Sequence, residues 1–293
     1  MRIAVVIPNY NSAKTIEDTL QSIKALNKLD LVTKVYLADD GSTDTSIQQA
    51  QSIFSDLYVL LNKPNIGQWK NLNRALQHIR SEGFDWVLVL HADDVVKPHW
   101  LELMVEQIEN ASTHVVSVCS SWDDWLPDGS IITGEDNSQR HVNLIKGTQE
   151  AVRNTIHRGC WWHISGAAIR LSVLETIGLF DPIYSHNSDY EYLLRILNSQ
   201  LEVIYIPRTL LLYRYHDLSV SSHSFRYNLD ISQGLSIRKK YRHLLSRREY
   251  LKLHQQSAVT VLRRMAKSLI NRDFARLVIS SKTLFKIAIS AIR

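Results

Sequence analysis

The chain has 293 residues, of which 45% are apolar and 22% charged, so it can bury a full core and is not a wholly disordered protein. Its two cysteines, Cys119 and Cys160, lack the spacing of a zinc site or a disulfide framework, and we expect two buried, reduced thiols. The apolar run at residues 3–7 is too short for a signal peptide, and no uncharged apolar run reaches the roughly 18 residues of a membrane span. These features predict a cytoplasmic protein.

The net charge of +5 conceals two oppositely charged regions. Residues 225–293 carry 16 basic and 3 acidic side chains, a charge of +13, so the first 224 residues carry a charge of −8. We therefore expect an acidic body and a basic tail with different partners.

Strand and helix patterns alternate over the first 110 residues. We expect Asn11 or Ser12 to cap the first helix, and Ser42 or Asp44 to cap the second. This order predicts an α/β fold with a mostly parallel sheet, right-handed crossovers and helices on both faces of the sheet. The expected strands are residues 3–7, 35–38, 57–61 and 86–90.

The second half of the chain is less regular. The segment Pro127-Asp128-Gly129-Ser130 predicts a tight hairpin turn, and residues 189–198 have the periodicity of a helix. Further strands are expected at residues 115–120, 164–169 and 203–206.

Polar segments follow three of the expected parallel strands. They are Pro8-Asn9-Tyr10-Asn11, Asp39-Asp40 and His91-Ala92-Asp93-Asp94. Ligands of such sheets bind beyond the carboxyl ends of the strands, where these segments meet. Four carboxylates would repel one another without a cation, so we expect a divalent cation bound to a phosphorylated ligand. Alternatively, each Asp caps the helix that follows, although capping accounts for only one member of a pair.

No glycine-rich phosphate-binding motif is present, neither G-x-G-x-x-G nor G-x-x-x-x-G-K-[ST]. Phosphates would therefore be neutralised by a metal and by side chains. No zinc-binding spacing occurs, and we interpret His91, His99 and His163 as surface or packing residues rather than metal ligands. Lys70 could bind phosphate, but a solvent-exposed helix face also accounts for it.

An ordered set of motifs runs from residue 5 to residue 216. Its members are Val5-Val6-Ile7-Pro8-Asn9-Tyr10-Asn11, Asp39-Asp40-Gly41-Ser42-Thr43-Asp44, Asn65-Ile66-Gly67 with Asn73, Ala92-Asp93-Asp94, Gly166, Ile177-Gly178-Leu179-Phe180-Asp181, Asp189-Tyr190-Glu191, Arg195 and Tyr213-Arg214-Tyr215-His216. In this order the motifs resemble the family 2 glycosyltransferases, which adopt the GT-A fold. The resemblance covers about residues 1–223 and implies an inverting transferase that uses a nucleotide-sugar donor.

The resemblance implies a role for each polar segment in donor binding. Asp40 would accept a hydrogen bond from the N3–H of uracil, with Asp39 beside it. Asp93 would lie near the ribose or sugar, and Asp94 would bind Mg²⁺ or Mn²⁺ on the diphosphate. The remaining donor-site residues implied are Pro8, Asn9, Tyr10, Gly67 and Asn73.

Arg214 and His216 match a segment that closes over the donor phosphates, although an exposed loop after a strand would explain them equally well. The chain departs from the family pattern at two positions. His91 stands where relatives often have Asp, and Ser188 stands where they commonly have an acidic residue. The metal-binding position is retained, so the first departure puts donor geometry in question more than activity.

Asp189 is the residue on which the mechanism would depend. It opens a predicted helix, where it could serve as the N-cap. The resemblance implies instead that Asp189 is the general base that takes the proton of the acceptor hydroxyl.

Four tryptophans, Trp122, Trp125, Trp161 and Trp162, are concentrated in the second half of the chain. Sugar rings stack on aromatic side chains, so these tryptophans could form an acceptor platform, while core packing is the alternative for each. We expect Trp161, Trp162 and Gly166 to contact the acceptor.

The basic tail contains amphipathic helices. Helical spacing places apolar residues on one stripe and most basic residues off it, which suits either an anionic membrane surface or packing on the body. No base-reading motif is present, so we expect no nucleic-acid partner. The stripe comprises Phe274, Leu277, Val278, Leu284, Phe285, Ala288 and Ile292, and the basic residues are Arg276, Lys282, Lys286 and Arg293.

We expect a GT-A domain at residues 1–223, with a nucleotide-binding half at 1–110 and an acceptor-binding half at 111–223. A basic helical extension would follow at residues 224–293. We expect a metal-dependent glycosyltransferase of the hexosyltransferase type, which transfers a sugar from a UDP-sugar to a hydroxyl group of a glycan or lipid-linked acceptor in surface polysaccharide synthesis. It would be either cytoplasmic or peripheral on the inner face of the cell membrane. Two alternatives are a sugar nucleotidyltransferase, which lacks support because no glycine-rich N-terminal loop is present, and a degenerate sugar-nucleotide binder without activity.

Overall fold

The first half of the chain forms the predicted alternation of strands and helices, in a computed structural model that describes residues 1–136, 141–216 and 219–292. Each predicted strand is present, with small differences at its ends. The elements are β1 (Ile3–Asn9), α1 (Ile16–Lys24), the 3₁₀ helix Leu29–Leu31, β2 (Lys34–Asp39), α2 (Ser46–Ile53), β3 (Tyr58–Leu61), α3 (Gln68–Ser81), β4 (Trp86–Val89), β5 (Val95–Val96) and α4 (Trp100–Glu109).

The second half adds longer strands and two helices that pack on the sheet. Helix α5 has no counterpart among the predicted elements, although Thr148 caps it by accepting a hydrogen bond from Ala151 N. The elements are β6 (Val115–Trp125), β7 (Ile131–Ile132), β8 (Asn143–Ile145), α5 (Gln149–Arg158), β9 (Ala168–Arg170), α6 (Val173–Thr176), α7 (Ser188–Asn198) and β10 (Glu202–Arg214).

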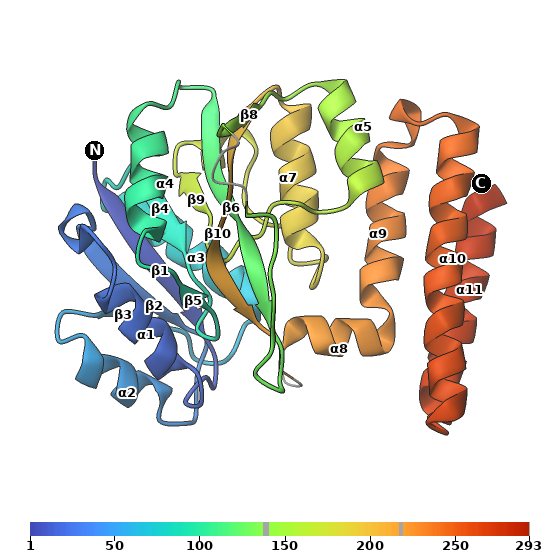
Figure 1. Cartoon of the computed structure of the whole chain (residues 1–293), viewed down its shortest axis with the longest axis horizontal. Coiled ribbons are helices and arrows are strands. Elements are labelled where there is room, and N and C mark those ends of the chain that lie inside the picture. The colour runs from blue at the N-terminus through green and yellow to red at the C-terminus, as the bar shows by residue number, and fades with distance from the viewer. Residues whose placement is uncertain (137–140, 217–218, 293) are drawn as a thin grey trace.

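In the described residues, ten strands form one sheet with the order β3-β2-β1-β4-β9-β6-β10-β5, while β7 pairs with β6 and β8 with β10. Strands β1 to β4 are parallel, and β6 and β10 are parallel to each other. β9 runs antiparallel to both β4 and β6 and joins the two groups. The predicted GT-A-like α/β fold with a mostly parallel sheet is therefore confirmed (Figure 1).

Side chains of β1 enter two cores, one on each face of the sheet, because successive residues of a strand point to opposite faces. Val6 packs in the core that contains α3, α5 and α7, whereas Val5 and Ile7 pack in the core that contains α1 and α4. Each fully buried residue of this kind stabilises the fold by about 1.5–3 kcal/mol. The two cores hold the carboxyl ends of the parallel strands in a fixed arrangement.

Three local predictions were wrong. Neither Ser42 nor Asp44 is the N-cap of α2, which is Thr45. Residues 164–169 were expected to be one strand, but β9 begins only at Ala168, because Gly166 adopts φ +85° and turns the chain. Neither Asn11 nor Ser12 is the N-cap of α1, which is Thr15. Asn11 instead lies at φ 51° and accepts a hydrogen bond from Thr43 N, which links the loops after β1 and β2.

Four helices follow β10 and stand beside the body in Figure 1: α8 (Val220–Tyr227), α9 (Leu229–Lys240), α10 (Arg247–Ile270) and α11 (Phe274–Ile292), with the 3₁₀ helix Arg242–Leu244 before α10. Helices α10 and α11 form an antiparallel pair, and α11 also contacts α8 and α9. The expected boundary between residues 223 and 224 falls within α8. As a structural unit, the extension therefore starts with this helix.

The apolar stripe predicted for the tail is divided between packing and solvent. Ile287 packs with Val261 and Ile231, and Leu284 contacts the same cluster. Phe274, Val278 and Phe285 are exposed. Arg293 and the side chain of Ile292 lie outside the described residues. None of the described helices is long and apolar enough to span a membrane.

Candidate functional site

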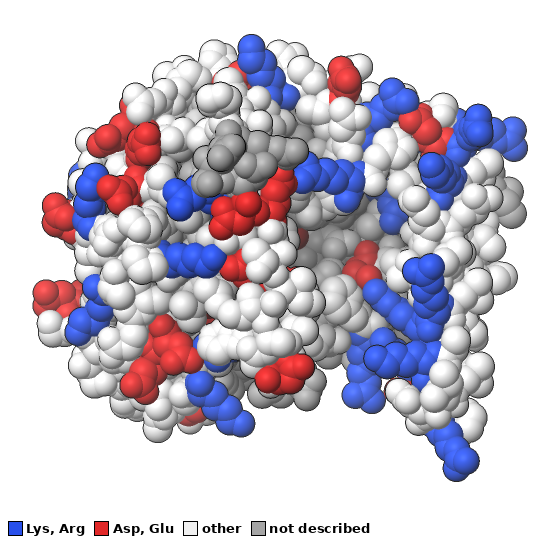
Figure 2. All heavy atoms as spheres, in the orientation of Figure 1, with Lys and Arg blue, Asp and Glu red and all other residues white. Residues whose placement is uncertain are grey.

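A cavity of about 1660 Å³ opens where the parallel strands end, and it extends to the C-terminal helices. Its walls include Pro8, Asp40 and Asp93 from the first half of the chain and Asp189 from α7, while α9 and α10 contribute further residues. Figure 2 shows the molecule hollowed between the body and these helices, with Lys and Arg side chains gathered on the helical side. The cavity therefore joins the predicted donor residues, the predicted base and the basic extension.

Asp40 is fixed on the cavity wall by its neighbours. Its Oδ2 accepts a hydrogen bond from Gly67 N at 2.8 Å, and its Oδ1 accepts bonds from Ile66 N at 2.9 Å and Asn62 Nδ2 at 3.1 Å. Gly67 adopts φ +91°, which favours glycine, and it precedes α3. The Asp40 carboxylate is thus held in one orientation beside the chain segment 65–67.

Asp39 does not line the cavity and is fully buried. It accepts hydrogen bonds from Asn9 Nδ2 at 2.6 Å and from the backbone N–H groups of Gly41 and Ser42. These contacts make Asp39 the residue that joins the loops after β1 and β2. Pro8, Asn9 and Tyr10 do line the cavity, and Tyr10 is 52% exposed.

Asn73 is also directed into the protein rather than into the cavity. Its Nδ2 donates to Phe180 O at 2.8 Å and its Oδ1 accepts from Phe180 N at 3.0 Å. Both polar atoms of the amide are therefore used to anchor the segment that leads to α7.

His91, Asp93 and Asp94 form a cluster in which one ligand atom of each residue lies within 4.8 Å of the others. Within the described part of the chain, the buried atoms His91 Nε2 and Asp94 Oδ2 have no hydrogen-bond partner. Burial lowers the pKa of His91, which keeps the imidazole neutral, and burial together with Asp93 raises the pKa of Asp94 well above its usual range. A neutral imidazole and hard carboxylate oxygens can bind a divalent cation, and the two unpartnered atoms fit such an ion.

His91 was interpreted from sequence as a surface or packing residue, but it belongs to this cluster. The signal that could have indicated this is its position at a strand end, two residues before Asp93. The ring of His163 lies edge-on to that of His91, with the two ring centroids 6.3 Å apart.

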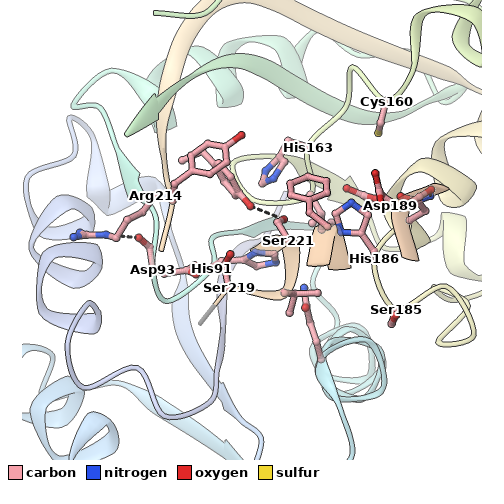
Figure 3. A pocket seen from close by; sticks show the side chains of 18 of the residues that line it. His91, Asp93, Cys160, His163, Ser185, His186, Asp189, Arg214, Ser219 and Ser221 are labelled. Carbon is pink, nitrogen blue, oxygen red and sulfur yellow. Dashed lines mark hydrogen bonds between the residues drawn. The ribbon is translucent and has the colours of Figure 1, made fainter. Parts of the chain in front are cut away.

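Arg214 and His216, at the end of β10, contact the same cluster. Arg214 donates from its backbone N–H to Asp94 Oδ1 at 3.0 Å and from Nε to Asp93 O at 2.8 Å. His216 Nε2 lies 2.9 Å from Asp93 Oδ2, and although burial opposes ionisation, this hydrogen bond helps to hold the pKa of Asp93 below its usual range. Arg214 also pairs with Asp18 at 2.7 Å. The predicted closing segment thus lies against the acidic cluster rather than in an isolated loop (Figure 3).

Asp189 lines the cavity and is the second residue of α7. The N-cap of this helix is Asn187, so Asp189 is not the N-cap considered from sequence. Its Oδ1 accepts a hydrogen bond from Tyr190 N at 2.7 Å, and burial raises the pKa of Asp189 to about 7. A carboxyl group with this pKa can exchange a proton near neutral pH. Figure 3 shows Asp189 at the opposite end of the drawn pocket from Asp93 and Arg214.

The residues expected to contact the acceptor do not line the cavity. Trp161 and Trp162 are buried in the core, where Trp162 stacks on Phe180, and neither lines the cavity. Gly166 forms a packed turn, with its N–H donating to Val89 O at 2.7 Å. These three residues therefore contribute to packing rather than to the cavity wall. The other two tryptophans considered, Trp122 and Trp125, line the cavity instead.

Several residues on the cavity wall could not be identified as site residues from the sequence. Cys160 was expected to be buried but is exposed on the wall, whereas Cys119 is buried as expected. Arg238 and Ser257 reach the cavity from α9 and α10. Their sequence environment is only that of an amphipathic basic helix, so only the packing of those helices brings them to the site.

Similar proteins include an uncharacterized glycosyltransferase of Nostoc sp., which is 32% identical over 186 residues, or 62% of this chain and 55% of the relative. The succinoglycan biosynthesis protein ExoA of Rhizobium meliloti is 23% identical over 70% of this chain and 63% of its own length. The chain thus spans between half and two thirds of the length of these relatives.

Among solved structures, S. aureus TarS 1–349 in complex with UDP-GlcNAc is similar, with a TM-score of 0.59, 15% sequence identity, and coverage of 96% of this chain and 91% of that chain. At this identity the likeness establishes the fold. The profile of Glycosyl transferase family 2 matches residues 4–156, about half of the chain. The chain belongs to glycosyl transferase family 2.

Proposed function

We propose that the protein transfers a sugar from a UDP-sugar to a hydroxyl group of a glycan or lipid-linked acceptor, with inversion at the anomeric carbon. The observation that carries this proposal is one cavity lined by Asp40, by His91 and Asp93 and, at its other end, by a carboxyl group with a pKa of about 7. The buried Asp94 lies behind this wall and clusters with His91 and Asp93. The solved complex of TarS with UDP-GlcNAc supports a uridine donor, and the name of ExoA supports polysaccharide synthesis.

In this proposal the donor lies along the ends of the parallel strands. Asp40 accepts a hydrogen bond from the N3–H of uracil, and the segment of Pro8 to Tyr10 lines the base. The free face of the Asp40 carboxylate suits this role because backbone N–H groups already hold it in place. Asp39 and Asn73 contribute indirectly, since each fixes a segment that carries cavity residues.

Asp94, with His91 and Asp93, would hold a divalent cation, Mg²⁺ or Mn²⁺. When bound, such an ion supplies positive charge that stabilises the departing diphosphate. Arg214 and His216 orient the cluster through their hydrogen bonds to Asp93 and Asp94. His91 in place of an acidic residue gives a ligand set with one less negative charge.

Asp189 acts as the general base. It takes the proton of the acceptor hydroxyl while the acceptor oxygen forms a bond to the anomeric carbon. The bond from that carbon to the diphosphate oxygen breaks, and its electron pair leaves with UDP. A single displacement of this kind inverts the anomeric configuration.

We also propose that the tip of the α10–α11 hairpin binds anionic membrane. Leu269, Ile270 and Phe274 are 60%, 82% and 69% exposed, and the exposed basic residues Lys267 and Arg272 lie beside them in the sequence. Apolar side chains can enter the interface, while basic side chains gain about 1 kcal/mol each near an anionic surface. This would place a lipid-linked acceptor near the cavity.

The donor site is tested by titrating UDP calorimetrically into wild type and Asp94→Ala, each with Mg²⁺ and with EDTA. We expect the wild type to bind in Mg²⁺ and to lose more than about tenfold in affinity in EDTA, and Asp94→Ala to bind weakly in both. Asp56→Ala, which changes an exposed Asp outside the cavity, is the control. Equal affinity in all samples would refute the metal-dependent donor site. Binding of UDP without any release of UDP from a UDP-sugar would indicate the degenerate binder.

A further inference from the structure

The C-terminal helices form one wall of the cavity and contribute Arg238, which forms no ion pair with any residue that the structure describes. Gly234 and Arg238 of α9, and Gln256, Ser257 and Thr260 of α10, line this wall. Asn187 and Tyr190, which flank Asp189, line the cavity as well. The wall therefore belongs to the end of the cavity where the proposed acceptor hydroxyl reacts.

Arg238 is bound only by neutral oxygen atoms. Its Nη1 donates to Leu253 O at 3.0 Å and its Nη2 donates to Ser257 Oγ at 3.1 Å. A guanidinium group has five N–H donors, so about three remain uncommitted in the described part of the chain. Burial lowers the pKa of Arg238, which reflects the cost of holding this charge away from water.

Other arginines near the cavity differ from Arg238 because each forms an ion pair with a carboxylate. Arg214 pairs with Asp18 at 2.7 Å, and Arg264 pairs with Asp230 at 2.7 Å. Asp230 is thus already neutralised on the same wall. Among the described residues, no carboxylate forms an ion pair with Arg238. A partly buried cation that forms no ion pair with the described residues at a cavity wall is suited to an anionic ligand.

The surroundings of Arg238 leave space for such a ligand. Gly234 has no side chain, and a Cβ atom at this position would lie 3.4 Å from Arg238 Nη2 and 3.6 Å from Asn187 Nδ2. Both nitrogen donors therefore lie beside the bare backbone of Gly234, which lines the cavity. Asn187 Nδ2 also donates to Asp230 O at 2.9 Å, which leaves its second N–H for a ligand. A group with two or three oxygens could accept hydrogen bonds from both.

We propose that the acceptor carries an anionic oxygen group, a phosphate or a carboxylate, which Arg238 binds while the acceptor hydroxyl lies at Asp189. This rests on the proposed function, because it names a property of that acceptor. It also gives the helical extension a role in acceptor selection. A neutral glycan would leave the partly buried Arg238 without an anionic partner, so the wall discriminates in favour of charged acceptors.

The test is calorimetric titration of inorganic phosphate and, separately, of acetate into protein saturated with UDP and Mg²⁺, so that the donor phosphate site is filled. We expect one anion to bind to the wild type and to bind about 10- to 100-fold more weakly to Arg238→Gln. Arg238→Lys keeps the charge and should bind with intermediate affinity. Arg263→Gln, at an exposed arginine of α10, should bind as the wild type does.

Thermal unfolding separates this role from a structural one. If Arg238 only joins α9 to α10, Arg238→Gln unfolds at a lower temperature but is stabilised by the anion as much as the wild type, and the proposal is wrong. Absence of anion binding to the wild type also overturns it. Binding of phosphate alone identifies a phosphate-bearing acceptor, and binding of acetate a carboxylate. If UDP itself does not bind, the proposed donor function fails, and the same anion titration without UDP decides the role of Arg238.

Discussion

Replacing Asp189 with Asn should remove the general base while leaving the fold intact. The Asn side chain has nearly the same size, and its Oδ1 can still accept the hydrogen bond that Asp189 receives from Tyr190 N at 2.7 Å. A general base typically contributes about 10²–10⁴-fold to the rate, so kcat should fall by that factor. UDP affinity should not change, because the donor residues lie at the other end of the pocket (Figure 3).

The pKa of Asp189 predicts a second, independent sign of general-base catalysis, which is the pH dependence of the rate. Burial raises this pKa to about 7, so about nine tenths of the carboxyl is ionised at pH 8 and about one tenth at pH 6. Only the ionised form accepts a proton, and kcat/KM of the wild type should therefore fall about tenfold from pH 8 to pH 6. The residual kcat/KM of Asp189→Asn should not fall in this way between pH 8 and pH 6.

Stability distinguishes catalysis from a structural role. Because the pKa is raised in the folded state, ionised Asp189 weakens the fold as the pH rises through about 7. Asp189→Asn removes this effect and should unfold at pH 8 at a temperature no lower than that of the wild type. Asp181→Asn, outside the cavity, is the matched control and should retain full activity. Near wild-type turnover of Asp189→Asn, measured by UDP release, would refute the reasoning.

Two further predictions concern the donor site and the extension. Asp40→Asn places an amide N–H₂ group against the backbone N–H group of either Ile66 or Gly67, which donate to different oxygens of Asp40. UDP affinity measured calorimetrically should fall by about tenfold or more, whereas unchanged affinity would exclude Asp40 from uracil binding. The double variant Ile270→Glu, Phe274→Glu should lose co-sedimentation with anionic vesicles, whereas Ile183→Glu, at an exposed apolar residue of the body, should sediment as the wild type does.

The parallel half of the sheet was predictable because its strands are continuous apolar runs that end in polar segments. The same reasoning could not separate Asp39 from Asp40. Adjacent residues at a strand end point to opposite sides, so Asp40 faces the cavity while Asp39 binds the loops behind it. Sequence locates the pair, but the direction of each side chain depends on the register of β2.

The tryptophans show a different limit. Trp122 and Trp162 have the same chemistry, yet Trp122 lines the cavity and Trp162 is in the core. No periodicity connects them, because Trp162 lies in an irregular segment before β9. Likewise, Arg238 meets Asn187 only through the packing of α9 against the body, which local patterns do not encode.

If the proposed function holds, we expect the wall formed by α9 and α10 to control which nucleophile reaches the donor. Without these helices, the end of the cavity at Asp189 would face bulk solvent, and water at its full concentration would compete with the acceptor hydroxyl. A base with a pKa near neutral pH activates water as readily as an alcohol. A chain shortened before α9 is therefore expected to hydrolyse its donor, so the extension would protect the sugar as well as select the acceptor.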